Sequence, residues 1–329
     1  MDKKLEKRII SSVTSDILRL TIYPTEQCNF RCSYCYQYYE NSKMSEEMVC
    51  ALLSFLNKRL NSLKVLHINW FGGEPLLAQD IIYKVSDLIQ NSKKNNQSLR
   101  YIGNITTNGY LLDSLTFKDL FEHGIKTYQI TLDGLESEHN KTRKLINGKG
   151  TFQKIWKNLL EIKSSNCEGN IKIRIHYNES NYKDLVPLIS CIKTEFLSDK
   201  RFKIYFRPVE KFGGKNDSDI ISVPYEKQKE ITNYLKSYVG NNDNLYNKFE
   251  NYICYASQLN SFVIRANGFI QKCDLGLDLV ANNVGILNLD GTLSIDRNKF
   301  IIWSKGLETK DEEMMSCPYY YYFKKDRNL

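Results

Sequence analysis

Apolar residues along the first two thirds of the chain follow two alternating patterns. Short runs that alternate between apolar and polar residues predict strands, and stretches with the spacing of an amphipathic helix lie between them. Ser45 and Thr151 stand where two of these helices would begin. The predicted strands are 18–23, 65–71, 101–106, 127–132, 171–176 and 202–207. The predicted helices are 46–60, 80–93, 113–123, 152–162, 182–196 and 225–238.

Six strand-helix units in this order predict parallel strands joined by right-handed crossovers. The expected fold class is therefore α/β, an open or partial (β/α)6 barrel. The pattern changes beyond this region, and a chain of 329 residues is long enough for a second, smaller domain. We expect an N-terminal extension at 1–17, the barrel at 18–240 and a small C-terminal domain at 241–329.

Polar residues occupy one face of the predicted strands. Helices cover the outer face of a parallel barrel, so the apolar positions point outward and the alternate positions face the lumen. A purely structural barrel fills its lumen with Val, Ile and Leu, whereas hydrogen-bonding groups predict an enclosed polar ligand. The inward positions are Arg19, Thr21, Tyr23, His67, Asn69, Asn104, Thr106, Gln129, Thr131, Asp133, Arg174, His176, Tyr205 and Arg207.

The four histidines are interpreted as structural. His67 and His176 are expected to be hydrogen-bonded groups of the lumen. His123 and His139 are expected to be exposed at helix or loop ends.

Composition narrows the class of protein. The chain has nine cysteines, a mostly charged N-terminus and no apolar run that could span a bilayer. The cysteines are therefore read as thiols of a cytoplasmic protein without a membrane partner. The net charge of +8 is dispersed over lysines of the predicted helices, so most of these lysines are expected on solvated helix faces. An acidic peptide is a candidate partner for this positive charge. Nucleic acid is not favoured.

Cys28, Cys32 and Cys35 lie in one short run, CNFRCSYC, directly after the first predicted strand. Three thiolates on one tight loop can hold three irons of a 4Fe-4S cluster and leave the fourth iron open to a ligand that is not protein. A zinc site would need a fourth ligand, and the nearest histidine, His67, lies on another element.

This spacing resembles the CxxxCxxC motif of the radical S-adenosylmethionine (SAM) enzymes. The resemblance implies that the amino and carboxylate groups of SAM chelate the open iron. It also implies that an electron cleaves SAM to a 5′-deoxyadenosyl radical. An electron donor such as flavodoxin or ferredoxin is then a partner. Tyr34 stands where the family keeps an aromatic residue beside the adenine.

Three later motifs extend the resemblance over roughly residues 15 to 210. Gly72-Gly73-Glu74 resembles the GGE motif, which implies that Glu74 binds the amino group of SAM. Asn108 lies in a run similar to the TNG motif, near the ribose and methionine end. Thr131, before Leu132-Asp133-Gly134, and Arg143 match residues that contact the SAM carboxylate in the peptide- and protein-modifying subgroup.

The C-terminal part resembles the SPASM domain, or the shorter twitch domain, which carry auxiliary clusters. Cys254, Cys273 and Cys317 match cysteines of that domain, with Asn267-Gly268 at an expected hairpin turn. Met314 and Phe323 occupy positions of two further cysteines. The resemblance implies either one auxiliary 4Fe-4S cluster or a reduced domain that keeps the fold without metal.

Asp274 directly follows Cys273. The resemblance makes it a candidate general base at the substrate, because desolvation would raise its pKa toward useful proton transfer. The alternative is an exposed loop aspartate without a role in the reaction.

The function favoured by the resemblance is a radical SAM enzyme that modifies a ribosomally made precursor peptide by a cross-link, a thioether or an epimerisation. The segment 1–17 is too short for a leader-binding domain, which leaves a separate leader-binding protein as a candidate partner and leaves open whether leader recognition occurs in trans. A sulfatase-maturing enzyme is the second candidate, although those enzymes usually have Gln at the position of Phe71 and a full set of SPASM cysteines. A non-catalytic iron-sulfur sensor or scaffold would need neither Glu74 nor Arg143.

Overall fold

A computed structural model describes residues 3–240, 245 and 252–324 of the chain. The chain forms two compact units, each built from more than one stretch of sequence. The first unit comprises Met1–Gln27, Tyr39–Gly103 and Lys248–Leu329. The second unit comprises Cys28–Tyr38 and Asn104–Asn247.

The first unit contains a mixed sheet with the strand order β12-β11-β10-β9-β1-β3, followed by the first half of β4. Strand β1 pairs in parallel with β3 on one side and with β9 on the other. The strands are β1 (Ile17–Ile22), β3 (Val65–Trp70), β4 (Arg100–Thr107), β9 (Ser261–Ile264), β10 (Phe269–Gln271), β11 (Asn283–Leu287) and β12 (Leu293–Ile295). The α-helices are α1 (Lys3–Val13), α2 (Glu46–Leu60), α3 (Gln79–Asn95), α9 (Arg297–Thr309), α10 (Glu312–Ser316) and α11 (Pro318–Phe323).

The second unit continues with the second half of β4, followed in the sheet by β5, β7 and β8. Strands β5, β7 and β8 are parallel. Two short strands, β2 and β6, form a separate antiparallel pair. The elements are β2 (Phe30–Cys32), α4 (Ser114–Glu122), β5 (Ile125–Leu132), α5 (Glu136–Thr142), β6 (Arg143–Leu145), α6 (Phe152–Lys163), β7 (Asn170–Tyr177), α7 (Val186–Phe196), β8 (Phe202–Pro208) and α8 (Tyr225–Val239).

The predicted α/β class is confirmed. All six predicted strands are present, as β1, β3, β4, β5, β7 and β8, and a helix follows each of them. Ser45 caps α2 by accepting from the backbone N–H of Met48. Thr151 does not cap α6 with its side chain, because its hydroxyl hydrogen-bonds elsewhere.

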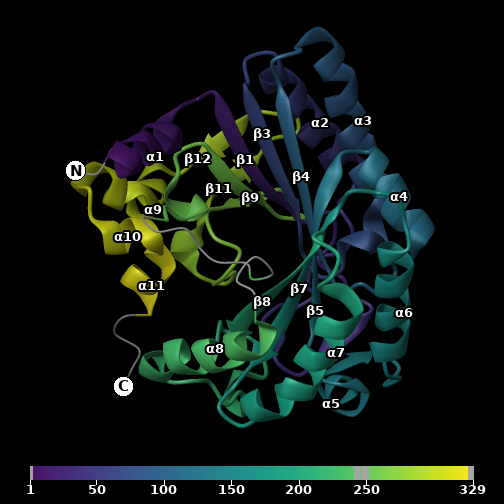
Figure 1. Ribbon diagram of the computed structural model, residues 1–329. Helices are drawn as coiled ribbons and strands as arrows, with labels where there is room; N and C mark the ends of the chain where they lie inside the picture. Colours follow the sequence, from purple (N-terminus) through teal and green to yellow (C-terminus); the bar gives the residue numbers. More distant parts are fainter. Residues whose placement is uncertain (1–2, 241–244, 246–251, 325–329) are drawn as a thin grey trace. The chain divides into compact units, whose positions relative to one another are not determined.

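The period-two pattern sets the two faces of the second unit's strands. In β7, Ile171, Ile173 and Ile175 are buried, whereas Lys172 and Arg174 between them are half-buried. Figure 1 shows α4, α6 and α7 along one side of this sheet. The helix-covered face is therefore apolar, and the polar residues lie on the other face, as predicted.

An aromatic chain joins this face to its helices. Phe202 of β8 stacks on Phe196 of α7, with ring centroids 5.0 Å apart, and Phe196 meets Trp156 of α6 edge to face. These contacts fix which face of the strand is buried.

The C-terminal strands extend the sheet of the first unit. Strands β9 and β10 are antiparallel and enclose a turn in which Gly268 has a φ of +84°, which confirms the predicted hairpin. Helix α1 was not predicted. Its Leu5 and Ile9 pack in a cluster with Ile253, Leu307 and Met315.

The predicted domain boundaries stay predictions, and the one at 240/241 borders residues outside the described part. No helix among the described residues combines the length and apolar character that crossing a bilayer requires.

Candidate functional site

The cysteine loop of the second unit is held by the short pairing of β2 with β6. Cys32 lies opposite Arg143 in this pair, and the N–H of Ser33 donates to the carbonyl of Thr142 at 2.9 Å. The pairing places the predicted cluster loop and the predicted carboxylate-binding arginine side by side. The pairing was not predicted, because three-residue strands are too short for a periodic pattern.

Cys28 is buried and receives two hydrogen bonds. The N–H of Phe30 donates to its Sγ at 3.3 Å, and Nδ2 of Asn108 lies 3.9 Å from the same sulfur. Asn108 also donates to Oδ1 of Asn29 at 2.7 Å. Asn108 therefore fixes the start of the cysteine loop.

The thiol of Cys32 is poorly suited to ionise alone. Burial raises its pKa to about 12, although the charge of Arg143 opposes this rise. Metal coordination deprotonates a thiol outright and so offsets the cost of burial. Cys32 therefore fits a metal ligand better than a free nucleophile.

The cysteine loop offers three thiols and no fourth protein ligand of its own, whereas a structural zinc site has four. Three thiols on one loop, with a backbone amide donating to one sulfur, match the ligation of a 4Fe-4S cluster.

Tyr34 belongs to a buried polar network. Its phenol donates to Oδ2 of Asp133 at 2.6 Å and accepts from Nη1 of Arg143 at 2.8 Å. Its ring meets His176 edge to face at 4.9 Å. Asp133 also accepts from the hydroxyl of Thr142 at 2.9 Å. These contacts hold the Tyr34 ring in place beside Asp133, Arg143 and His176.

Charge in this network is unevenly distributed. Nδ1 of His176 lies 3.4 Å from Oδ1 of Asp133. Burial would raise the pKa of Asp133, but His176 and Arg143 hold it below its usual range. Burial, reinforced by Arg174, lowers the pKa of His176 to about 4. At neutral pH the carboxylate is therefore ionised and the imidazole neutral.

Arg143 retains an unsatisfied donor. The residue is buried, and its Nε has no hydrogen-bond partner among the described residues. Leaving a buried donor unmade is costly, and a guanidinium fork matches a carboxylate. The orphaned Nε thus fits the predicted contact with the carboxylate of SAM.

Thr131 is fully buried and accepts from Nε of Arg174 at 3.0 Å. The two residues are register partners on β5 and β7. Sequence reasoning placed both in the lumen but did not pair them. Parallel strands bring equivalent inward positions together, so the register could have suggested the contact.

The expectation that His139 is exposed was wrong. His139 is completely buried, its Nδ1 accepts the N–H of Asp133 at 3.3 Å, and its Nε2 lies 3.0 Å from Oγ1 of Thr151. Thr151 in turn donates to the carbonyl of Arg143 at 2.7 Å. The imidazole is buried because it links the end of β5 to the segment that carries Arg143.

His123 and His67 are both half-buried. His123 is half-buried rather than exposed, and its Nδ1 lies 2.7 Å from the carbonyl of Asp119 at the end of α4. His67 is half-buried on β3, where burial and the charge of Arg19 lower its pKa to about 3.

In the first unit, the Gly72-Gly73-Glu74 motif packs against the chain's own backbone. A Cβ on Gly72 would lie 2.3 Å from the carbonyl oxygen of Thr25, and one on Gly73 would lie 2.2 Å from that of Gln27. The N–H of Glu74 donates to Gln27 at 2.9 Å. The glycines therefore allow close approach of the segment that precedes the cysteine loop.

Glu74 itself is fully buried, and its Oε1 accepts from the N–H of Leu76 at 3.0 Å. The carboxylate thus caps a short 3-10 helix, Pro75–Ala78. A buried carboxylate fixed by its own backbone is suited to meet an ammonium group in a defined direction.

The segment before the cysteine loop has a further brace that the sequence did not reveal. Arg265 forms two hydrogen bonds of 2.6 Å with the buried Glu26, and Asn41 donates to the same carboxylate at 2.8 Å. Residues distant in sequence thus fix Glu26, which only the tertiary fold can show.

The C-terminal cysteines also gather in the first unit. The N–H of Cys254 donates to the carbonyl of Met315, close to Cys317 in sequence. Burial raises the pKa of Cys273, and Asp274, Cys254 and Cys317 add to the rise. Three separate segments therefore place Cys254 and Cys317 near enough to Cys273 to raise the pKa of its thiol.

Asp274 is half-buried and bound to Tyr255. The Tyr255 phenol donates to Oδ1 of Asp274 at 2.5 Å and accepts the N–H of Asp274 at 2.8 Å. The same phenol lies 4.0 Å from Sγ of Cys273. Asp274 is thus held in one orientation, and its contact with Tyr255 was not predicted from the sequence.

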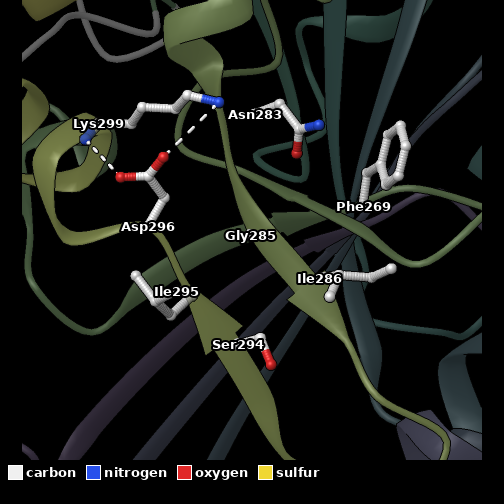
Figure 2. A pocket seen from close by; sticks show the side chains of 8 residues that line it. All are labelled: Phe269, Asn283, Gly285, Ile286, Ser294, Ile295, Asp296 and Lys299. Atoms are coloured by element: carbon white, nitrogen blue, oxygen red, sulfur yellow. Dashed lines mark hydrogen bonds and ion pairs between the residues drawn. The ribbon is translucent and has the colours of Figure 1, made fainter.

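A shallow pocket of about 420 Å³ lies elsewhere on the first unit, over β10, β11 and β12 (Figure 2). Nζ of Lys299 lies 3.7 Å from Asp296 at its edge. None of its lining residues is a predicted site residue. The pocket residues are Phe269, Asn283, Gly285, Ile286, Ser294, Ile295, Asp296 and Lys299.

Comparison with known sequences agrees with the motifs. The sequence model of the Radical SAM superfamily matches residues 22–189. A GTP 3′,8-cyclase of Clostridium perfringens is 28% identical over 280 residues, which cover 78% of this chain and 80% of the relative. A GTP 3′,8-cyclase of Clostridium acetobutylicum is 34% identical over 155 residues, 43% of this chain and 44% of the relative.

Solved structures share the fold. The structure of anSMEcpe with bound AdoMet and Cp18Cys peptide has a TM-score of 0.65 at 20% identity and covers 87% of this chain and 80% of that one. Streptococcus suis SuiB bound to the precursor peptide SuiA has a TM-score of 0.57 at 17% identity, covering 84% and 65%. At these identities the likeness concerns the fold alone.

Proposed function

The chain belongs to the radical SAM superfamily, and on that premise we propose that it modifies a peptide substrate. As a member, it is an enzyme that uses SAM and a 4Fe-4S cluster. When bound, these groups supply a 5′-deoxyadenosyl radical that abstracts a hydrogen atom from the substrate. The residues of this chain bind, orient and complete that chemistry.

The orphaned Nε of buried Arg143 is the observation that carries the proposed cofactor site. We assign Cys28, Cys32 and Cys35 to the cluster and Arg143 to the carboxylate of SAM. The phenol of Tyr34 accepts a hydrogen bond from the guanidinium of Arg143 and donates one to Asp133. These two bonds fix the plane of the Tyr34 ring, which we assign to the adenine of SAM.

The remaining cofactor contacts follow the family motifs. Glu74, whose side chain is fixed by the N–H of Leu76, binds the amino group of SAM. Gly72 and Gly73 let the preceding backbone close on this segment. Asn108 fixes the start of the cysteine loop through Asn29. Thr131 fixes Arg174 by accepting from its Nε. Both residues complete the surroundings of the cofactor.

The peptide class rests on two supports. Two solved structures with this fold are bound to peptides, as their descriptions state. The chain also gathers Cys254, Cys273 and Cys317 in one region of the first unit, which suits the single auxiliary cluster of a twitch-like or reduced SPASM domain. The partners are a ribosomally made precursor peptide, an electron donor such as flavodoxin or ferredoxin, and a separate leader-binding protein.

Asp274 is proposed as the base that accepts a proton from the substrate after hydrogen abstraction. The Tyr255 phenol fixes one carboxylate oxygen, which leaves the carboxylate a single orientation. Tyr255 is a positioning residue in this scheme, because it acts through Asp274.

A nucleotide is the second candidate substrate. It is favoured by the relatives named GTP 3′,8-cyclase, one of which aligns over 78% of this chain. A sulfatase-maturing activity, suggested by the fold of anSMEcpe, ranks lower because Phe71 and the reduced cysteine set depart from the pattern of those enzymes.

The two substrate classes can be separated by SAM turnover. The genes on either side are first searched for a short Cys- or aromatic-rich open reading frame. Dithionite-reduced, reconstituted enzyme is then incubated with SAM and either GTP or the candidate peptide from that search. We expect the peptide to raise the yield of 5′-deoxyadenosine and to change in mass. Stimulation by GTP alone, with a nucleotide product, would assign the nucleotide class instead.

A further inference from the structure

The pair of strands β2 and β6 has two different faces. Arg31 of β2 and Lys144 of β6 are register partners, and both side chains are exposed. The next pair in the register is Cys32 with Arg143, and Arg143 is buried. Because successive side chains of a strand point to opposite faces, Cys32 and Arg143 lie on one face and the two exposed cations lie on the other.

The turn after β6 extends this exposed face. Lys149 is exposed, and Ile146 is 61% exposed although isoleucine is usually buried. The N–H of Ile146 donates to the carbonyl of Asn29 at 3.0 Å, which fixes the turn to the cysteine loop. The N–H of Leu145 donates to the carbonyl of Lys149 at 3.0 Å and closes the turn. We call Arg31, Lys144, Ile146 and Lys149 the outer patch.

The charge of this region has one sign. Residues 141–149 contain four cationic residues and no acidic one. Two of the four are engaged elsewhere, since Arg143 lies in the proposed SAM site and Lys141 pairs with Glu138 at 2.7 Å. Lys144 and Lys149 have no carboxylate partner among the described residues. The two lysines therefore present their charge to an external partner.

The register of the outer patch has an electrostatic cost. Like charges that lie directly opposite each other on an antiparallel pair are destabilising, and Arg31 lies opposite Lys144. The guanidinium of Arg31 is held in place, because its Nη1 donates to the carbonyls of Cys28 and Phe30 at 2.8 and 2.7 Å. An acidic surface bound to the outer patch would offset the repulsion.

The position of the outer patch favours an electron donor over a substrate. A substrate must reach SAM, which we assign to the face of Arg143. An electron donor can act from the opposite face, provided that its path to the cluster is short, because electron transfer slows steeply with distance. Arg31 directly precedes Cys32 in the chain, so a protein docked on the outer patch lies close to the cysteine loop.

We propose that the outer patch docks an acidic redox protein of the flavodoxin class, which reduces the cluster of the cysteine loop. One electron passes from the reduced flavin to the cluster, so the flavin loses one electron, the cluster gains it, and no bond forms or breaks. Exposed Ile146 supplies an apolar contact among the charges, as interfaces combine apolar centres with polar rims. The inference rests on the proposed assignment of Cys28, Cys32 and Cys35 to the cluster and not on the substrate class.

The test compares two reductants of the reconstituted enzyme. Photochemically reduced flavodoxin must dock, whereas dithionite is a small ion that needs no docking surface. Lys144→Glu with Lys149→Glu reverses two charges, so 5′-deoxyadenosine formation at subsaturating flavodoxin should fall at least about tenfold. With dithionite, formation should stay within about twofold of the wild type, because both residues are exposed and outside the cofactor site.

Binding supplies a readout that does not depend on turnover. Isothermal titration calorimetry with oxidised flavodoxin should show binding to the wild type that weakens as the salt concentration rises. The double variant should bind at least about tenfold more weakly.

Control variants isolate the position and the sign of the charge. Lys200→Glu with Lys229→Glu reverses the same charge at exposed sites outside the outer patch and should change binding less than about twofold. Lys144→Arg with Lys149→Arg keeps the charge and should retain binding.

Damage to the cysteine loop is checked separately. Lys144→Glu places a carboxylate opposite Arg31, so the double variant should be at least as stable as the wild type in denaturant unfolding. Its iron content should be unchanged. The single variant Lys149→Glu repeats the comparison of reductants outside the strand pair.

Equal loss of activity with flavodoxin and dithionite would overturn the proposal, because the outer patch would then serve the cofactor or the substrate. Equal weakening by the variant at Lys200 and Lys229 would also overturn it, since general attraction would explain binding. A wild type that cleaves SAM with dithionite alone would refute the docking and leave the cluster assignment standing. A wild type that is inactive with both reductants would refute the cluster assignment itself, and the docking with it.

Discussion

The two groups of cysteines are assembled in different ways. Cys28, Cys32 and Cys35 lie on one loop of the second unit, within a run of eight residues. Cys254, Cys273 and Cys317 come from three separate segments of the first unit. Cysteines within one short run can be recognised as a motif from the sequence alone. Cysteines from distant segments can be recognised as one site only when the fold shows that they lie close together.

Their surroundings differ as well. The first group adjoins a dense network, in which Tyr34 bridges Asp133 and Arg143 and leaves one guanidinium donor orphaned. The second group adjoins the hydrogen-bonded pair of Tyr255 and Asp274. The first arrangement leaves a buried donor that we assign to a charged ligand, and the second holds one carboxylate in place, which we propose accepts a proton.

Removing the first group should have the largest effect. Replacement of Cys28, Cys32 and Cys35 by Ala should abolish SAM cleavage and lower the iron content of anaerobically reconstituted protein from about eight to about four per chain. Iron analysis and 5′-deoxyadenosine assay provide the measurement. Four irons in the wild type and none in the variant would remove the auxiliary cluster, and stoichiometric zinc would contradict the whole account.

A substitution beside the second group of cysteines, at Asp274, should lower the yield of modified peptide without lowering SAM cleavage. Asp274→Asn keeps the shape of the side chain but cannot accept a proton, so peptide product should fall by on the order of a hundredfold while SAM cleavage persists. Mass spectrometry of peptide and 5′-deoxyadenosine separates the two steps.

Tyr255→Phe sharpens this prediction, because it frees the carboxylate without removing it. Product should fall less, by about tenfold, if Tyr255 only positions Asp274. Wild-type product from Asp274→Asn would show that Asp274 is not the base, and the base should then be sought among His67, His176 and Tyr205.

Loss of the orphaned donor should weaken the cofactor itself. Arg143→Ala removes a charged hydrogen bond and should weaken SAM binding by more than roughly 1.5 kcal/mol, or about tenfold. Glu74→Ala should have a similar effect at the other end of the amino acid. Equilibrium dialysis with labelled SAM gives the affinities. Unchanged binding in both variants would mean that the cofactor is placed wrongly.

The smallest expected effect concerns stability around the glycine motif. Gly73→Ala places a Cβ 2.2 Å from a backbone oxygen of Gln27 and should destabilise the protein by about 1–3 kcal/mol. Gly148→Ala is the control: Gly148 has a φ of +81°, but nothing lies within 4 Å of its Cβ position. Denaturant unfolding compares them. Because Gly73, unlike Gly148, has no positive φ, a loss in Gly73→Ala smaller than that in Gly148→Ala would show that the added Cβ is accommodated without a steric penalty.

The sequence predicted strands and their faces well because the alternation of Ile171, Lys172 and Ile173 follows directly from strand geometry. It missed the pairing of β2 with β6, because strands of three residues are fixed by tertiary contacts and not by periodicity. His139 was misjudged for a related reason. Helix α5 is polar throughout, and only the packing of Thr151 against it shows that the imidazole is buried.

The residues of the sequence motifs could be predicted only in part. The place of the cysteine loop after the first strand could be predicted, since its three thiols lie within eight residues, and their role as cluster ligands stays a prediction. The contacts of Glu74 and Asn108 with their own chain could not be predicted, because they depend on Leu76, Asn29 and the course of the backbone. The assignment of these residues to SAM stays a prediction.

Transfer of deuterium from the peptide to the cofactor product tests the central claim most directly. A candidate precursor peptide, found by searching the genes on either side, is prepared with deuterium at its side chains and Cα positions and incubated with reduced enzyme and SAM. We predict deuterium in 5′-deoxyadenosine, together with an altered peptide, because hydrogen abstraction joins the two. Unlabelled 5′-deoxyadenosine and an unchanged peptide, with deuterium appearing only when labelled GTP replaces the peptide, would contradict it.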